Sequence, residues 1–177
     1  MPKIIPNLKE TIILQGRKTL LENGYKGFNI REIAKCCGIG IGTLYNYFAN
    51  KDELIIEILN DDWNSIIKFS NNQIERDVPL RTKIKDLYIR IDSFLSNYMD
   101  AFIEMAYSGN KTKCEHYKIM SPLYLSFEAV LAYHKNKGEI KNAVPIDKLS
   151  IFIISNMVMF SKNKDLSFEE IYNCFNL

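Results

Sequence analysis

The sequence over residues 28–51 is FNIREIAKCCGIGIGTLYNYFANK, and it predicts two short helices joined by a tight turn. Asn29 can cap the first helix, and Glu32 stands three residues later, which is the capping-box spacing. Gly38 is the residue type best able to adopt the left-handed conformation that ends a helix. A second helix is expected over residues 41–48. The stretch therefore predicts a helix, a glycine turn and another helix.

The second of these helices has an apolar face and a polar face. Leu44 and Phe48 are four residues apart and can face the first helix. The rest of the surface carries hydroxyl, amide and aromatic groups, from Thr43, Tyr45, Asn46 and Tyr47. This arrangement is typical of a helix-turn-helix, whose second helix enters the major groove of DNA. The alternative is two core helices of an ordinary bundle, in which each polar side chain needs a buried hydrogen-bond partner.

The charge distribution along the 177 residues agrees with nucleic-acid binding by the amino-terminal part of the chain. Residues 1–51 hold eight lysines and arginines against three acidic residues, a net charge of +5, whereas residues 52–177 carry −3. A basic module on an acidic body favours phosphate binding by the first part of the chain.

Other classes of protein are disfavoured. The composition, 47% hydrophobic and 25% charged, is that of a folded globular protein. No secretion signal or apolar run of membrane length is found, so a cytoplasmic protein without membrane contact is expected. The four cysteines form no spaced framework, and we interpret them as reduced thiols.

The sequence carries little that suggests catalysis or metal binding. Cys114-Glu115-His116 is the one triplet where a metal could be suspected, although a stray thiol in a surface loop is the simpler interpretation. No phosphate-cradling glycine loop or nucleophile motif is found. We therefore expect no enzymatic activity, no metal and no cofactor.

Helical periodicity continues through the rest of the chain, and no strand pattern is found. The other helices are expected over residues 7–23, 50–72, 79–107, 115–137, 146–160 and 167–175. We therefore predict an all-α protein. The polar segment before Pro79 is the clearest break, which suggests a helix-turn-helix domain over residues 1–50, a connecting helix over 51–76 and a carboxy-terminal helical domain over 77–177.

Over residues 8–58 the chain resembles the amino-terminal domain of TetR/AcrR-type transcriptional regulators. The residues that carry the resemblance are Gly24-Tyr25, Ile30 to Ala34, Cys37-Gly38-Ile39, Gly42 to Phe48 and Lys51 to Leu54. The resemblance implies a TetR-like fold, in which the carboxy-terminal helical bundle binds a small hydrophobic or aromatic effector and forms a homodimer. It further implies a ligand-responsive repressor that binds double-stranded DNA at a palindromic operator.

The resemblance also implies which side chains meet DNA. The expected contacts are Arg31, Ile41, Gly42, Thr43, Tyr45, Asn46, Tyr47 and Lys51. Hydroxyl and amide groups can hydrogen-bond base edges or phosphates, and Lys51 adds charge at a helix amino terminus. Two alternatives stay open: the Tyr45 ring can pack inward, and Arg31 can be a solvated charge.

The chain departs from the family pattern at the start of the second helix. Gly40 stands where the family usually has serine, which removes a hydroxyl that would cap this helix. Ile41 replaces a basic or polar residue and offers a thymine methyl an apolar contact in place of a hydrogen bond. A helical interaction protein that keeps the fold but has lost specific operator binding is therefore the alternative function.

Aromatic and methionine side chains gather on the expected helices over residues 79–107 and 115–137. The candidate ligand-binding residues are Tyr88, Phe94, Tyr98, Phe102, Tyr117, Met120, Tyr124 and Phe127. Such side chains suit a pocket for a flat or hydrophobic effector, and a plain helical core is the alternative. The last two helices are expected to form a dimer face, because successive apolar residues leave apolar groups on more than one side. Its candidate residues are Ile151, Ile154, Met157, Val158, Phe168 and Phe175.

Overall fold

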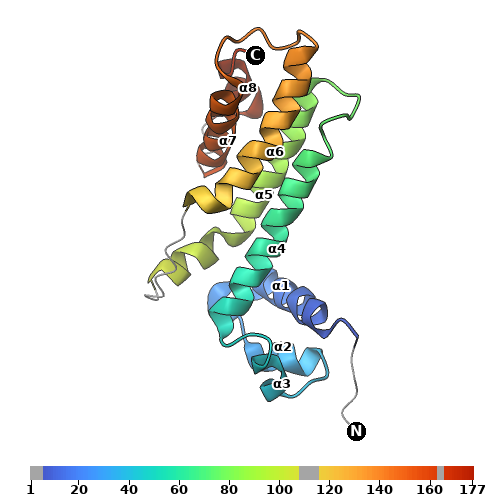
Figure 1. Cartoon of the computed structure of the whole chain (residues 1–177). Coiled ribbons are helices and arrows are strands. Elements are labelled where there is room, and N and C mark those ends of the chain that lie inside the picture. The colour runs from blue at the N-terminus through green and yellow to red at the C-terminus, as the bar shows by residue number, and fades with distance from the viewer. Residues whose placement is uncertain (1–5, 108–115, 163–165) are drawn as a thin grey trace. The chain divides into compact units, whose positions relative to one another are not determined.

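The computed structural model describes residues 6–107, 116–162 and 166–177, the side chains of 106, 107 and 116–118 excepted. These residues form α-helices and no strand (Figure 1). The helices are α1 (Leu8–Gly27), α2 (Ile30–Cys36), α3 (Ile41–Tyr45), α4 (Lys51–Asn71), α5 (Leu80–Tyr107), α6 (His116–Asn136), α7 (Ile146–Lys162) and α8 (Phe168–Cys174). The predicted all-α fold is confirmed.

The chain divides into two compact units. The first contains the chain up to Asp62 together with the end of α5 from Asn97 onward, and the second begins at Trp63 and holds α6, α7 and α8. Helix α4 passes from Asp62 to Trp63 without a break and so contributes to both units. The domain boundaries suggested by the sequence, at residues 50 and 76, stay a prediction.

Helix α1 packs on α4 at a glycine. Gly16 is buried, and a Cβ atom added to it would lie 2.9 Å from Ile58 Cδ1. A contact this short would make the end of the Ile58 side chain shift, so the observed approach of the two helices uses the small size of glycine. The core of the first unit continues from this crossing through Ile33 on α2 and Leu44 on α3, which are fully buried.

A polar network joins three helices of the first unit. Arg17 of α1 pairs with Asp61 and Asp62 of α4, and its Nε lies 2.8 Å from Asp62 Oδ1. Tyr98 of α5 is buried, and its hydroxyl donates to Asp62. Burial, followed by the hydrogen bond to Asp62, raises the pKa of the Tyr98 hydroxyl, which keeps it protonated as a donor. Asp62 thereby ties both α1 and α5 to α4.

Side-chain caps begin α4 and α8. Asn50 Oδ1 accepts from the Glu53 N–H at 2.9 Å, and the Glu53 carboxylate accepts from the Ala49 N–H at 2.5 Å. Ser167 and Glu170 form a complete capping box at α8. These reciprocal bonds satisfy backbone donors that a helix start otherwise leaves without partners.

Two helix boundaries differ from those the sequence suggests. Gly24, with φ 63° and ψ −176°, breaks α1 where its end is predicted, but helical residues resume up to Gly27. Helix α3 ends at Tyr45 and is shorter than expected. Beyond it, the backbone N–H groups of Tyr47 and Phe48 still donate to the Leu44 carbonyl, at 2.9 and 3.1 Å, so the chain keeps a helical course.

In the second unit α7 packs on both α6 and α8 (Figure 1). Trp63 of α4 anchors this unit, since its ring centroid lies 5.1 Å from that of Phe94 and its Nε1 donates to the Ile119 carbonyl at 2.9 Å. Ser150 Oγ on α7 donates to the Tyr124 carbonyl on α6 at 2.7 Å. Among the helices that the structure describes, none is long and apolar enough to cross a membrane.

Candidate DNA-binding surface

The turn between α2 and α3 is built by a glycine in the left-handed region. Gly38 has φ 68°, and the Ile39 N–H donates back to the Ala34 carbonyl at 3.0 Å, which closes the end of α2. At the other end of α2, Asn29 Oδ1 accepts from the Arg31 N–H at 3.0 Å. The sequence therefore fixes both ends of α2, and with them the position at which α3 begins.

Helix α3 is held by its buried face and presents the opposite face to solvent. Leu44 is fully buried and Phe48 nearly so. Tyr45 is 50% exposed, so its ring does not pack inward. The outward residues of this segment are Ile41, Gly42, Tyr45, Asn46 and Tyr47, with Thr43 half-buried beside them. The side chains predicted on the second helix to meet DNA are therefore exposed or half-buried, while Leu44 and Phe48 are buried.

Lys51 is positioned differently from the other predicted contacts. Its Nζ donates to the Tyr25 carbonyl and lies 4.0 Å from the centroid of the Tyr25 ring. Burial lowers the pKa of the Lys51 ammonium, partly offset by Asp52. The Tyr25 hydroxyl in turn donates to Asp52 Oδ1 at 2.7 Å. Lys51 therefore joins the end of α1 to the start of α4, in addition to any contact with phosphate.

Part of the positive charge in residues 1–51 is paired within the first unit. Lys9 lies 2.6 Å from Glu57, Lys26 lies 3.0 Å from Glu104, and Arg17 joins the Asp61 and Asp62 network. Within the described part of the chain, neither Arg31 nor Lys35 has an ion-pair partner. Both are exposed on α2, four residues apart and so on one face. Lys35 was not among the residues predicted to meet DNA, although its spacing from Arg31 could have indicated it.

Gly40 precedes α3 in an extended conformation, with φ −70° and ψ 148°, and provides no side-chain cap. No atom lies within 4 Å of a Cβ added there. We expect Gly40→Ser to stabilise the protein by about 1 kcal/mol, because serine caps the helix and restricts the unfolded chain. Urea unfolding followed by circular dichroism measures this. Gly40→Ala supplies the Cβ but no hydroxyl, so a gain from alanine as large as that from serine would contradict the capping explanation.

The candidate ligand-binding residues are divided between the two units. None of them lines the groove in the second unit that is described below. The side chain of Tyr117 lies outside the described residues. The members of the first unit are Tyr98 and Phe102, and those of the second are Tyr88, Phe94, Met120, Tyr124 and Phe127. Phe94, Met120 and Phe127 are buried as core.

The candidate dimer residues differ in exposure. Ile154, Met157 and Phe175 are buried within the chain's own core. Ile151 is exposed, and Val158 and Phe168 are half-buried. Other exposed apolar side chains on α6 and α7 are Leu125, which is 67% exposed, Met159, which is 60% exposed, and Phe152.

Comparisons with known proteins agree with this geometry. The family described as bacterial regulatory proteins, tetR family, matches residues 12–58, which span most of α1, all of α2 and α3, and the start of α4. The fatty acid metabolism regulator protein of Bacillus subtilis is 23% identical over 133 residues, which cover 73% of this chain and 69% of that protein. The HTH-type transcriptional regulator QacR of Staphylococcus aureus is 20% identical over 171 residues, 91% of this chain and 89% of that protein.

A solved structure shares the fold over nearly the whole chain. The transcriptional regulator FadR from Bacillus subtilis, in complex with stearoyl-CoA, superposes with a TM-score of 0.60 at 18% identity, over 94% of this chain and 95% of that chain. The family match covers the segment whose outer face is exposed in the structure. With its helix-turn-helix and its all-helical fold, the chain is a DNA-binding transcriptional regulator whose residues 12–58 match the family described as bacterial regulatory proteins, tetR family.

Proposed function

We propose that the protein is a homodimeric, ligand-responsive repressor that acts on a palindromic operator in the cytoplasm. The observation that supports this most directly is the polar surface of α3 and the residues that follow it, where Asn46 and Tyr47 are exposed and Thr43 is half-buried. Polar groups on an exposed recognition helix have base edges and phosphates as natural partners. In a dimer, two such helices enter major grooves about 34–36 Å apart.

Base reading and phosphate binding are divided between α3 and α2 in this proposal. Thr43 and Asn46 hydrogen-bond base edges, and Ile41 contacts a thymine methyl. Arg31 and Lys35 on α2 bind phosphates, because the first helix of the motif crosses the backbone and both cations are exposed and unpaired within the described residues. Lys51 supports this surface through Tyr25 and contributes charge at the start of α4.

The proposed dimer face lies on α6 and α7. Leu125, Ile151 and Met159 are exposed in the single chain, and the last two lie eight residues apart on one face of α7. Large apolar side chains that are exposed on neighbouring helices mark interaction surfaces when they gather in a patch. A second copy of the chain covers them in a twofold arrangement in which each helix pair meets its own equivalent.

The effector in this proposal is a hydrophobic small molecule, and a long-chain acyl thioester is the first class to test. The support comes from the FadR structure with stearoyl-CoA and from the aromatic side chains of the second unit.

Helix α4 runs unbroken through both units, so a ligand that favours one position of this helix changes the fraction of protein that is competent to bind DNA. An effector that bound without changing operator affinity would contradict this mechanism.

The competing proposal is an interaction protein that has lost specific operator binding, suggested by the missing cap at Gly40 and by apolar Ile41. Fluorescence anisotropy on DNA from the gene's own upstream region, against scrambled DNA at two salt concentrations, separates the two. A repressor prefers the upstream DNA at both salts. Equal, steeply salt-dependent binding to both DNAs supports the alternative.

We expect the double variant Thr43→Ala with Asn46→Ala to lose roughly 100-fold in affinity for the upstream DNA and most of its preference over scrambled DNA. Each lost base contact costs about 1–3 kcal/mol. The matched control is Asn64→Ala with Ser65→Ala, which removes the same kinds of group from exposed positions on α4. The prediction fails if both double variants bind equally well.

A further inference from the structure

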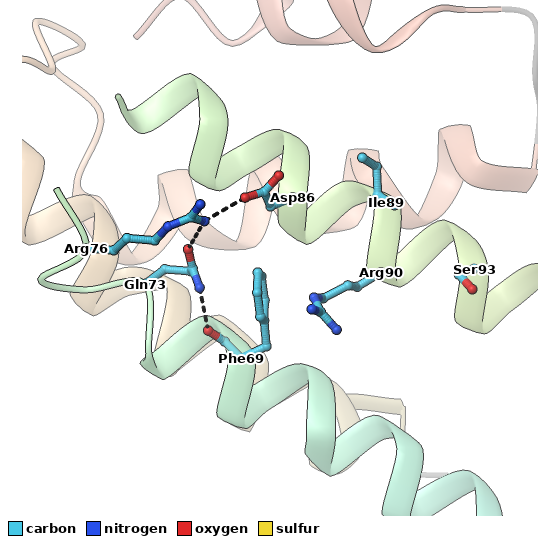
Figure 2. Close-up of a pocket in the computed structure, with 7 residues that line it drawn as sticks. All are labelled: Phe69, Gln73, Arg76, Asp86, Ile89, Arg90 and Ser93. Carbon is cyan, nitrogen blue, oxygen red and sulfur yellow. Dashed lines mark hydrogen bonds and ion pairs between the residues drawn. The ribbon is translucent and has the colours of Figure 1, made fainter. Parts of the chain in front are cut away.

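A polar groove lies in the second unit, between the end of α4 with the segment that follows it and the first half of α5 (Figure 2). Its volume is about 710 Å³, which is within the range of small-molecule sites. The residues that line it are Phe69, Gln73, Arg76, Asp86, Ile89, Arg90 and Ser93. All belong to one compact unit.

In this groove the guanidinium of Arg90 lies over the ring of Phe69. Its guanidinium carbon lies 3.8 Å from the centroid of the Phe69 ring, which is a stacking distance (Figure 2). Asp86 is four residues earlier on the same helix and would be the usual ion-pair partner. Asp86 instead binds Arg76 Nη1 at 2.7 Å. Within the described residues, the guanidinium N–H groups of Arg90 therefore have no acceptor, while the Phe69 ring lies against the guanidinium.

Arg76 is fixed as well, by a chain of polar contacts. Its Nη1 donates both to Asp86 Oδ2 and to Gln73 Oε1, the latter at 3.0 Å. Gln73 is buried, and its Nε2 donates to the Phe69 carbonyl at 3.2 Å. Both bonds of Arg76 use the same nitrogen, so its Nε and Nη2 donate to no described residue. The groove thus contains two guanidinium groups, and each has N–H donors that bind no described residue.

We propose that this groove binds the phosphate group of a small organic phosphate. Two guanidiniums and one carboxylate leave a net positive charge, and the planar fork of Arg90 matches two phosphate oxygens. The Ser93 hydroxyl, one turn beyond Arg90 on α5, supplies another donor. A phosphate dianion gains more from this charge than a single carboxylate does, and the open polar walls tolerate the rest of the molecule.

This inference goes beyond the proposed repressor function and is tested without DNA, so either can fail alone. The experiment is isothermal titration calorimetry of the full chain with ADP as the probe and adenosine as the phosphate-free control. We expect ADP to bind and adenosine not to bind. Inorganic pyrophosphate separates the contribution of the phosphate groups from that of the nucleoside. If pyrophosphate competes with ADP, the phosphate groups alone provide the affinity, and if it does not compete, the nucleoside provides part of it.

The decisive variant is Arg90→Gln, which we expect to weaken ADP binding at least about tenfold because it removes a charge-assisted, bidentate contact. Arg90→Lys keeps the charge but loses the fork and the stacking, so it restores only part of the affinity. Lys68→Gln removes one charge from an exposed neighbour that does not line the groove, and it should stay within about twofold of the parent. Absence of ADP binding, equal binding of adenosine, or unchanged affinity in a folded Arg90→Gln protein would each overturn the proposal.

Discussion

Replacing Leu44 with alanine is expected to lower the free energy of unfolding of the first unit by about 3 kcal/mol, in the range measured for buried leucines. Leu44 is fully buried, and it lies on a helix of only five residues that has no side-chain cap. A helix this short is not stable alone, so its contacts with the rest of the unit decide whether it forms. Circular dichroism during urea unfolding measures the change.

The affinity of the Leu44→Ala protein for the operator should also fall, by roughly 10- to 100-fold, because a smaller fraction of the protein has a formed recognition helix. Anisotropy on the upstream DNA provides this measurement. Leu14→Ala is the matched control, since Leu14 is a leucine of the same unit that is 65% exposed on α1, and its loss should change stability by less than about 0.5 kcal/mol. Full operator affinity in a Leu44→Ala protein of unchanged stability would mean that this side chain does not anchor the helix.

Replacing Leu125 with glutamate is expected to convert the proposed dimer to a monomer. Leu125 is the most exposed large hydrophobic residue of the described chain, at 67%, and the proposed interface would have to bury the new carboxylate without a partner. Sedimentation velocity reports the mass directly. Since a monomer engages only one half-site, we also expect operator affinity to fall by about 100-fold or more.

Ile89→Glu is the control for this experiment. Ile89 is also an exposed aliphatic residue of the second unit, but it lies on α5. The Ile89→Glu protein should keep the parent mass. If the Leu125→Glu protein stays dimeric, the interface does not include this part of α6. If the parent protein is monomeric at micromolar concentration, the dimer is not part of its function.

Local sequence signals predicted the elements well, since their causes lie within a few residues of each other. Gly38 ends α2 in the left-handed region, and Asn50 and Ser167 cap the helices they precede. Leu44 and Phe48 face the core because their spacing matches one helical turn. Helix α3 ends earlier than expected, at Tyr45.

Side-chain partners far along the chain could not be predicted in the same way. The sequence indicated a basic front, but it did not show that Lys9, Arg17 and Lys26 pair with acids of α4 and α5. It also placed Lys51 on DNA without revealing Tyr25 beneath it. An ion pair depends on which helices cross and on how each helix is rotated about its axis. The local periodicity of a sequence predicts neither.

The sequence by itself determined the helices, the turn and the polar outer face of α3, because capping, left-handed glycine and helical spacing act over a few residues. Only the tertiary structure decided which apolar residues of α7 remain outside. Ile154 and Met157 are covered by the chain's own core, while Met159 is exposed. It also decided that Arg90 stacks on Phe69 while Asp86 pairs with Arg76. The physical reason is that burial and pairing are properties of packed surfaces, which residues distant in sequence create together.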